Sequence, residues 1–180
     1  MQEVSLWLVP QPEDAAYLQG IIDQLAEKYQ APRFSPHVTL AGRLQVSEQY
    51  QSPLSDLAAA TPILQMHNHG LDHSAALFRT VYIRTSLGDS LVALRNQVYK
   101  LWPENTVKPF MPHISLIYKE LTSSERQLII QALKLKEMFI FDTLAVVRPQ
   151  QPGEWTAVET WQTLDCWNLD HHFAEVNPLP

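Results

Sequence analysis

The stretch FSPHVTL, residues 34–40, decides the fold because it returns later in the chain as FMPHISL, residues 110–116. The two copies keep Phe, Pro, His and Leu in place and exchange only Val for Ile, Thr for Ser and one variable residue. A chance match of this quality within one chain is expected in fewer than roughly one sequence in fifty. The repetition therefore indicates two related halves, each with one histidine motif.

Each motif reads as a short β-strand in which residues two apart point to the same face. His37 and Thr39 therefore project together, as do His113 and Ser115, while the apolar residues between and after them point to the opposite face. A single histidine in a strand is usually structural. Packing alone, however, does not require an imidazole beside a hydroxyl twice, so we expect both pairs to act in chemistry.

Two imidazoles around one centre suit a reaction that removes one proton and delivers another in the same step. An imidazole has an ordinary pKa of about 6.5 and is available in both protonation states near neutral pH. The two hydroxyls can donate hydrogen bonds to the oxygens of an anion whose charge grows in the transition state. This set of groups can cleave a phosphodiester without a metal ion.

Hydrophobic periodicity around the motifs predicts alternating strands and helices. Strands are expected at 4–9, 37–40, 63–69, 77–84, 114–118, 139–147 and 158–167, and helices at 12–29, 47–60, 91–101 and 122–133. Ser47 is expected to cap the second helix and Thr122 or Ser123 the fourth. Residues 70–74 read as a hairpin turn, and the tail from residue 170 to 180 as loosely held.

This element order, given twice, predicts one domain, residues 1–180, with an internal pseudo-repeat. The fold class is α+β, with two pseudo-symmetric lobes, each an antiparallel-type sheet faced by helices, and a central cleft. We expect the ligand to bind in that cleft.

Composition excludes several classes of protein. The single cysteine, Cys166, allows neither an internal disulfide nor a thiolate metal cage, which fits a cytoplasmic protein. The N-terminus does not read as a signal peptide, and no apolar run approaches the roughly 18 residues of a membrane span. A net charge of -6 without a cluster of Lys and Arg argues against long nucleic acid as partner. We expect a monomer that binds a small ligand.

The doubled motif resembles the two signature motifs of the 2H phosphoesterase superfamily, and the chain most resembles its cyclic phosphodiesterase branch. The likeness includes SLWLVP at 5–10, LFRTVYI at 77–83 and PHISLIY at 112–118. It implies metal-independent and cofactor-free hydrolysis of small cyclic phosphodiesters to monophosphates. The implied substrates are nucleoside 2',3'-cyclic phosphates or ADP-ribose 1'',2''-cyclic phosphate.

The resemblance also implies roles for six residues: the acid/base pair His37 and His113, the phosphate donors Thr39 and Ser115, and the substrate-binding residues Tyr118 and Trp7. The motifs are nearly interchangeable, so the sequence leaves open which histidine is the acid and whether the product is the 2'- or 3'-phosphate. We favour His113 as the base and His37 as the acid.

Three alternatives stay open from the sequence. The segment MHNHGLDH, residues 66–73, places His67, His69 and His73 near one another, but no cysteine or obvious carboxylate completes a metal site. A non-catalytic module that binds nucleotides or RNA would keep the cleft, although Arg or Lys would serve pure binding as well as histidine. An enzyme that processes RNA ends is the third alternative.

Overall fold

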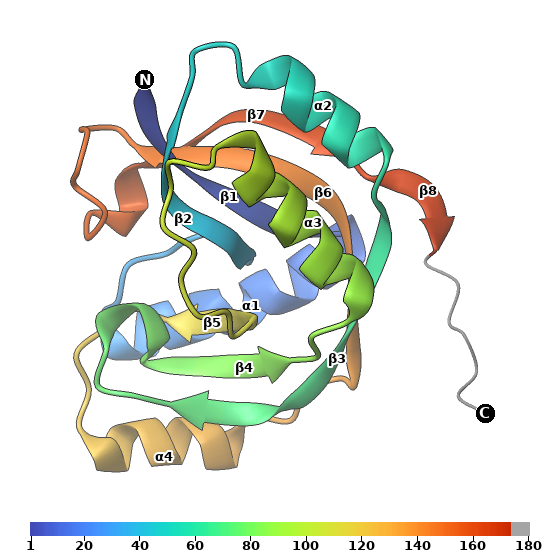
Figure 1. Cartoon of the computed structure of the whole chain (residues 1–180). Coiled ribbons are helices and arrows are strands. Elements are labelled where there is room, and N and C mark those ends of the chain that lie inside the picture. Colours follow the sequence, from blue (N-terminus) through green and yellow to red (C-terminus); the bar gives the residue numbers. More distant parts are fainter. Residues whose placement is uncertain (174–180) are drawn as a thin grey trace.

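The strands and helices of the protein alternate along the whole chain, and a computed structural model describes residues 1–173, with side chains up to residue 170 (Figure 1). The strands are β1 (Gln2–Pro10), β2 (Val38–Val46), β3 (Pro62–His73), β4 (Val81–Thr85), β5 (His113–Ile117), β6 (Met138–Pro149), β7 (Trp161–Asn168) and β8 (Asp170–Phe173). The helices are α1 (Pro12–Tyr29), α2 (Gln51–Ala59), α3 (Asp89–Leu101) and α4 (Ser123–Ala132). Short 3-10 turns span Leu77–Arg79 and Val158–Thr160.

The strands form one sheet in the order β7-β6-β1-β2-β5-β4-β3-β8, and β3 also pairs with β6. The pairings are antiparallel except for β3 with β8. The two motif strands, β2 and β5, are neighbours, with Val38 opposite Ile114. The α+β class and the antiparallel sheet predicted from the sequence are confirmed.

The two sides of the sheet do not correspond to the two halves of the chain. Strands β3 and β4 come from the first half but lie beside β5, whereas β6 and β7 return to lie beside β1. As a result each motif strand has a neighbour on both edges, β1 and β5 for β2, and β2 and β4 for β5. His113 is the first residue of β5 and His37 directly precedes β2, so both histidines lie at the ends of interior strands.

Helices pack against both parts of the sheet. Helix α1 contacts β5 and β1, and α4 contacts β3 and β4, while α2 contacts β7 and α3 contacts β2 and β3. In Figure 1, α2 and α3 lie toward one end of the molecule and α1 and α4 toward the other. The predicted helical spacing of α1 is confirmed, because Leu18, Ile22 and Leu25 are buried against the sheet.

The first turn of α1 is also anchored by charge. The carboxylate of Asp14 is buried, accepts a hydrogen bond of 2.6 Å from the backbone N–H of Ile140, and forms an ion pair with Lys136. An acidic group near a helix N-terminus interacts favourably with the helix dipole. Asp14 thus joins α1 to the start of β6.

One predicted feature is wrong within β3. The hairpin turn expected at residues 70–74 is absent, because Gly70 continues β3 through a bulge between Asn68 and Leu71. Gly70 has a φ of 96°, and its N–H donates to the Asn68 side chain at 2.8 Å. Glycine and asparagine here kink the strand without reversing it.

The first residues of helix α2 and strand β4 also differ from the sequence prediction. Ser47 does not cap α2, which begins at Gln51 after Tyr50. The strand expected at 77–84 is shorter, because Leu77–Arg79 forms a 3-10 turn and the strand begins at Val81.

The tail prediction is wrong for Asp170–Phe173, which pairs with β3 as β8, and residues 174–180 lie outside the described part of the chain. Within that part, no helix has the length and apolar character needed to cross a membrane.

Candidate active site

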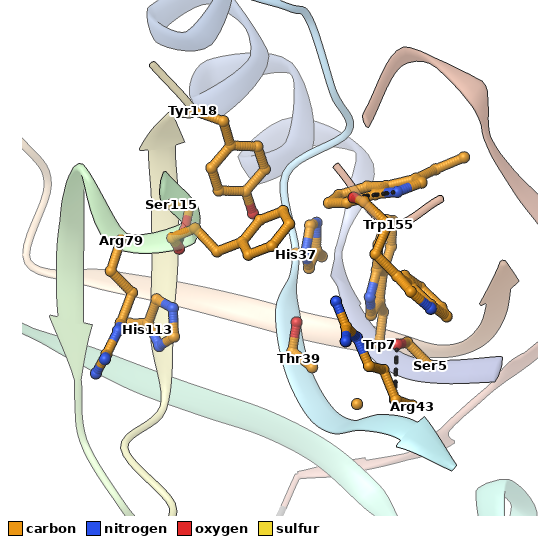
Figure 2. A pocket seen from close by; sticks show the side chains of 13 residues that line it. Ser5, Trp7, His37, Thr39, Arg43, Arg79, His113, Ser115, Tyr118 and Trp155 are labelled. Carbon is orange, nitrogen blue, oxygen red and sulfur yellow. Dashed lines mark hydrogen bonds between the residues drawn. The ribbon is translucent and has the colours of Figure 1, made fainter. Parts of the chain in front are cut away.

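A cavity of about 350 Å³ opens between the two motif strands (Figure 2). It is lined by all six residues singled out in the sequence: His37, Thr39, His113, Ser115, Tyr118 and Trp7. In Figure 2, His37 and Thr39 face the cavity from one side and His113 and Ser115 from the other. The fold therefore brings the two motifs to one centre, as a paired mechanism requires.

Both imidazoles are held by the backbone in the same way. His37 Nδ1 lies 2.7 Å from the carbonyl oxygen of Ser35, and His113 Nδ1 lies 2.9 Å from that of Met111. In each motif the carbonyl belongs to the residue two positions before the histidine. A carbonyl can only accept, so Nδ1 carries a proton and Nε2 is the nitrogen left to exchange one.

His37 is the more enclosed of the two histidines, with a side chain only 5% exposed. The indole of Trp7 stacks on its ring at 3.5 Å between centroids and 4° between planes. Burial lowers the pKa of His37 to about 4, with a further lowering from the positive charge that His113 can carry. His37 is therefore neutral at pH 7 in the free protein.

His113 has a milder environment. Its ring is half-buried and meets the ring of Tyr82 edge-on at 5.2 Å. Burial lowers the pKa of His113, and so does the nearby charge of Arg79, while hydrogen bonding to the carbonyls of Met111 and Phe78 raises it. Two residues in equivalent motif positions thus have different proton affinities.

The two motif hydroxyls are also not equivalent. Thr39 lies opposite Trp7 across the β1–β2 ladder, and its hydroxyl makes no side-chain hydrogen bond within the described part of the chain. The hydroxyl of Ser115, 4% exposed, donates to the carbonyl of Phe78 at 3.0 Å. Thr39 is free to donate to a ligand, whereas Ser115 first has to give up that bond.

Tyr118 and Trp7 line the cavity mainly through packed rings. Tyr118 stacks on Phe34 at 4.0 Å with 21° between planes, and burial raises its pKa, so the phenol stays protonated. One face of Trp7 is occupied by His37, and its ring meets Trp161 at 5.3 Å in an edge contact. Trp7 therefore stacks directly on His37, and the stacking of Trp7 on a nucleobase stays a prediction.

The cavity also holds residues that the sequence analysis did not single out. Arg43 and Arg79 line it from opposite sides, and Arg43 lies 6.0 Å from the Trp155 ring (Figure 2). Arg43 has a φ of 57°, an unusual backbone for a residue other than glycine. These residues come from separate segments with no shared spacing. Only the folded chain brings them together.

The alternative metal site is not assembled on β3. His73 Nδ1 accepts a hydrogen bond of 3.1 Å from Arg126, so its lone pair is already used. Among the described side chains, which run up to residue 170, there is no group of three His, Cys, Asp or Glu residues placed to hold a metal ion.

A sequence model of the family described as "Cyclic phosphodiesterase-like protein" matches residues 1–177, nearly the whole chain. The chain belongs to this family. As a member of the cyclic phosphodiesterase-like family, itself part of the 2H phosphoesterases, it is an enzyme that cleaves phosphodiesters. A curated cyclic phosphodiesterase of Arabidopsis thaliana is 24% identical over 177 residues, covering 92% of this chain and 94% of the relative.

Solved structures share the fold of this family member. The LigT protein of E. coli complexed with 3'-AMP has a TM-score of 0.60 at 17% identity, covering 94% of this chain and 99% of the other. TT0787 of Thermus thermophilus has a TM-score of 0.61 at 14% identity, with the same coverage of both chains. LigT has also been crystallised with ATP and with NADP+. At these identities the likeness establishes the fold alone.

Proposed function

We propose that the protein hydrolyses small cyclic phosphodiesters, nucleoside 2',3'-cyclic phosphates or ADP-ribose 1'',2''-cyclic phosphate, to monophosphates by a two-histidine acid/base mechanism. The observation that carries this proposal is the pair of imidazoles, His37 and His113, each tied through Nδ1 to a matching carbonyl and both lining one cavity. Membership of the cyclic phosphodiesterase-like family and the curated relative from Arabidopsis support the same substrate class.

The proposed reaction is an addition of water to the cyclic phosphate. One neutral histidine removes a proton through Nε2 from the water whose oxygen attacks phosphorus. The bond from phosphorus to one ribose oxygen breaks, and the other histidine, charged, gives its Nε2 proton to that oxygen. Thr39 and Ser115 donate hydrogen bonds to the non-bridging oxygens as charge grows on them.

The pKa values support His37 as the base and His113 as the acid, the reverse of the assignment favoured from the sequence. The base must be neutral while the acid is charged. When the base has the lower pKa, this combination is the dominant form between the two values. Burial lowers the pKa of both histidines, but His37 is the more buried and its pKa falls to about 4, whereas the pKa of His113 is lowered less.

Steady-state kinetics with 2',3'-cyclic AMP test the mechanism. His37→Ala and His113→Ala should each lower kcat by about 10² to 10⁴, the range for a lost general acid or base. His67→Ala, on β3 and outside the cavity, is the matched control and should keep normal turnover. Normal turnover in either motif variant would overturn the paired mechanism.

The pH dependence of kcat/KM reports the free enzyme and should be bell-shaped, with its maximum on the acidic side of neutrality. The acidic limb reflects protonation of His37 near pH 4, and the basic limb reflects loss of the proton from His113 below its ordinary pKa. A rate that rises to a plateau without a descending limb would rule out the general acid.

A metal requirement is tested in the same assay. Hydrolysis should survive excess EDTA, because the proposed acid, base and oxyanion donors are all side chains. Loss of activity on chelation that zinc restores would contradict the proposal. Tight, salt-sensitive binding of RNA without hydrolysis of the cyclic phosphate would favour the binding module instead.

A further inference from the structure

The backbone seam between the two motif strands is short. Within the described chain, β2 and β5 share one register pair, Val38 with Ile114. On the other edge of β2, the pairing with β1 runs from Gln2 opposite Val46 to Leu8 opposite Val38. A single pair fixes neither the spacing nor the angle of two strands. The relative position of His37 and His113 therefore depends on side chains that cross the seam.

One side chain on α3 crosses it. Arg95 is 8% exposed, and its Nε donates to the carbonyl of Leu40 at 3.2 Å, while Nη2 donates to the carbonyl of Lys108 at 2.6 Å. Its guanidinium carbon lies 4.5 Å from the centre of the Phe110 ring and 4.8 Å from that of Tyr99. Leu40 is the last residue of FSPHVTL and Phe110 the first of FMPHISL. Arg95 thus contacts both histidine motifs.

The charge of Arg95 has no carboxylate partner among the residues described. Burying a cation is costly unless dipoles or opposite charge compensate it, and here two carbonyls and two ring faces do so. An apolar residue would fill the same space without that cost. A planar fork that reaches two carbonyls in fixed directions is the property that only arginine supplies.

A second contact crosses the seam from the other motif. Phe34, the first residue of FSPHVTL, stacks on Tyr118, which follows β5. The phenylalanine that opens each motif therefore makes a contact toward the other half, Phe34 with Tyr118 two residues after FMPHISL, and Phe110 with Arg95, which bonds Leu40. This gives a physical reason for repeating Phe three positions before each histidine.

We propose that Arg95 is a positioning residue that sets the spacing of the two histidines through Leu40 and the segment Lys108–Phe110. The proposal rests on the proposed two-histidine function. Reacting groups lose rate steeply when displaced by about 1 Å, whereas binding of a small anion at one of them survives such a shift. Loss of Arg95 should therefore affect turnover more than the Michaelis constant.

Arg95→Met in the full-length chain tests this with 2',3'-cyclic AMP. We expect kcat to fall by about 10- to 100-fold, with KM changed by less than about threefold. Arg95→Lys keeps the charge but reaches only one carbonyl, so its kcat should lie between that of Arg95→Met and that of the natural protein. If Arg95→Met does not fold, Arg95→Lys alone decides, and normal kcat in it would overturn the proposal.

Asn105→Ala is the matched control. Asn105 also ties the segment between α3 and β5 to β2, because its amide bonds the N–H of Gln45 at 2.8 Å and the carbonyl of Gln45 at 3.2 Å. Gln45 lies toward the far end of β2 from His37. Asn105→Ala should therefore keep kcat within about threefold of normal. An equal loss of kcat in Asn105→Ala would mean that Arg95 acts only through general stability.

A readout without turnover separates this proposal from the proposed function. Inorganic phosphate should shift the imidazole NMR signals of His37 and His113 with one shared dissociation constant in the natural protein. In Arg95→Met the two signals should saturate separately, each with its own dissociation constant.

Four outcomes are then distinct. Shared saturation of the two signals in Arg95→Met overturns the positioning role. A natural protein that binds phosphate between the histidines but hydrolyses no cyclic phosphate overturns the proposed function, and the NMR comparison still decides the role of Arg95. A natural protein that shows no shared phosphate site overturns both. Separate saturation in the variant alone supports the positioning role.

Discussion

At the scale of single residues, the two motifs are almost the same in sequence and clearly different in surroundings. His37 lies under the indole of Trp7 and is buried, while His113 is half-buried beside Arg79. The Ser115 hydroxyl is bonded to a carbonyl, whereas Thr39 has no such partner in the described structure. The two motifs are thus symmetric in sequence, but their histidines differ in burial and their hydroxyls in hydrogen bonding. A reaction with one base and one acid needs two unlike histidines.

The hydroxyl asymmetry leads to a prediction for two matched variants. Thr39→Val should lower kcat/KM for 2',3'-cyclic AMP by about 10²-fold, the effect of one lost oxyanion donor. Ser115→Ala should cost less, about tenfold, because its hydroxyl must break the 3.0 Å bond to Phe78 before it can donate. Steady-state kinetics check the order of the two losses. A larger loss in Ser115→Ala would show that the bond to Phe78 is not retained when substrate approaches.

At the scale of elements, helix ends follow local chemistry where the sequence supplies a complete signal. Helix α4 begins after Thr122, whose hydroxyl accepts from the Glu125 N–H at 3.2 Å while the Glu125 carboxylate accepts from the Thr122 N–H at 2.7 Å. This capping box confirms the helix start predicted at Thr122 or Ser123 and assigns the cap to Thr122. Ser47 had no such partner three residues later, and α2 begins further along the chain.

The capping box gives a stability prediction that leaves catalysis unchanged. Thr122→Ala should lower the free energy of unfolding by about 1 kcal/mol, because the first turn of α4 loses a hydrogen-bond acceptor. Ser124→Ala, inside the same turn, is the control and should change it by less than about 0.5 kcal/mol. Urea unfolding measures both. Neither residue lines the cavity, so kcat/KM should stay normal, and a loss of activity in Thr122→Ala would link α4 to the site.

At the scale of the whole molecule, folding encloses a titratable group that must stay neutral. His37 is buried in the folded protein with a pKa of about 4, against about 6.5 in an unfolded chain. Below pH 6.5 His37 therefore binds a proton in the unfolded chain but stays neutral in the folded protein. The contribution of His37 to stability is complete above pH 6.5 and is lost as the pH falls toward 4.

This proton linkage is measurable by denaturant unfolding between pH 7 and pH 4. The free energy of unfolding of the natural protein should fall between pH 7 and pH 4. In His37→Gln this fall should be smaller by about 3 kcal/mol. Ser124→Ala, which changes no titratable group, should leave the pH dependence unchanged. An identical pH dependence in His37→Gln and in the natural protein would mean that His37 keeps an ordinary pKa in the folded state.

The prediction from sequence succeeded where neighbours along the chain decide the outcome. The period-two alternation in HVT and HIS placed each histidine beside its hydroxyl, and the helical spacing of Leu18, Ile22 and Leu25 set the buried face of α1. It failed at Gly70, where pairing with β4 before and after the glycine, at Asn68 and Leu71, kept the strand extended through a bulge. Partners distant in sequence override a local turn signal because they satisfy the backbone on both sides.

The sequence by itself determined the α+β class, the cyclic phosphodiesterase-like family and the repeated pairing of imidazole and hydroxyl. Local residue patterns and their repetition were sufficient to predict all three. The tertiary structure decided which strands lie beside which, where Arg43, Arg79 and Arg95 stand, and how unlike the two histidines are. Burial and the field of neighbouring groups set a pKa, and both arise only when segments far apart in the chain pack together. Two motifs that are nearly identical in sequence therefore differ in proton affinity only after the chain has folded around them.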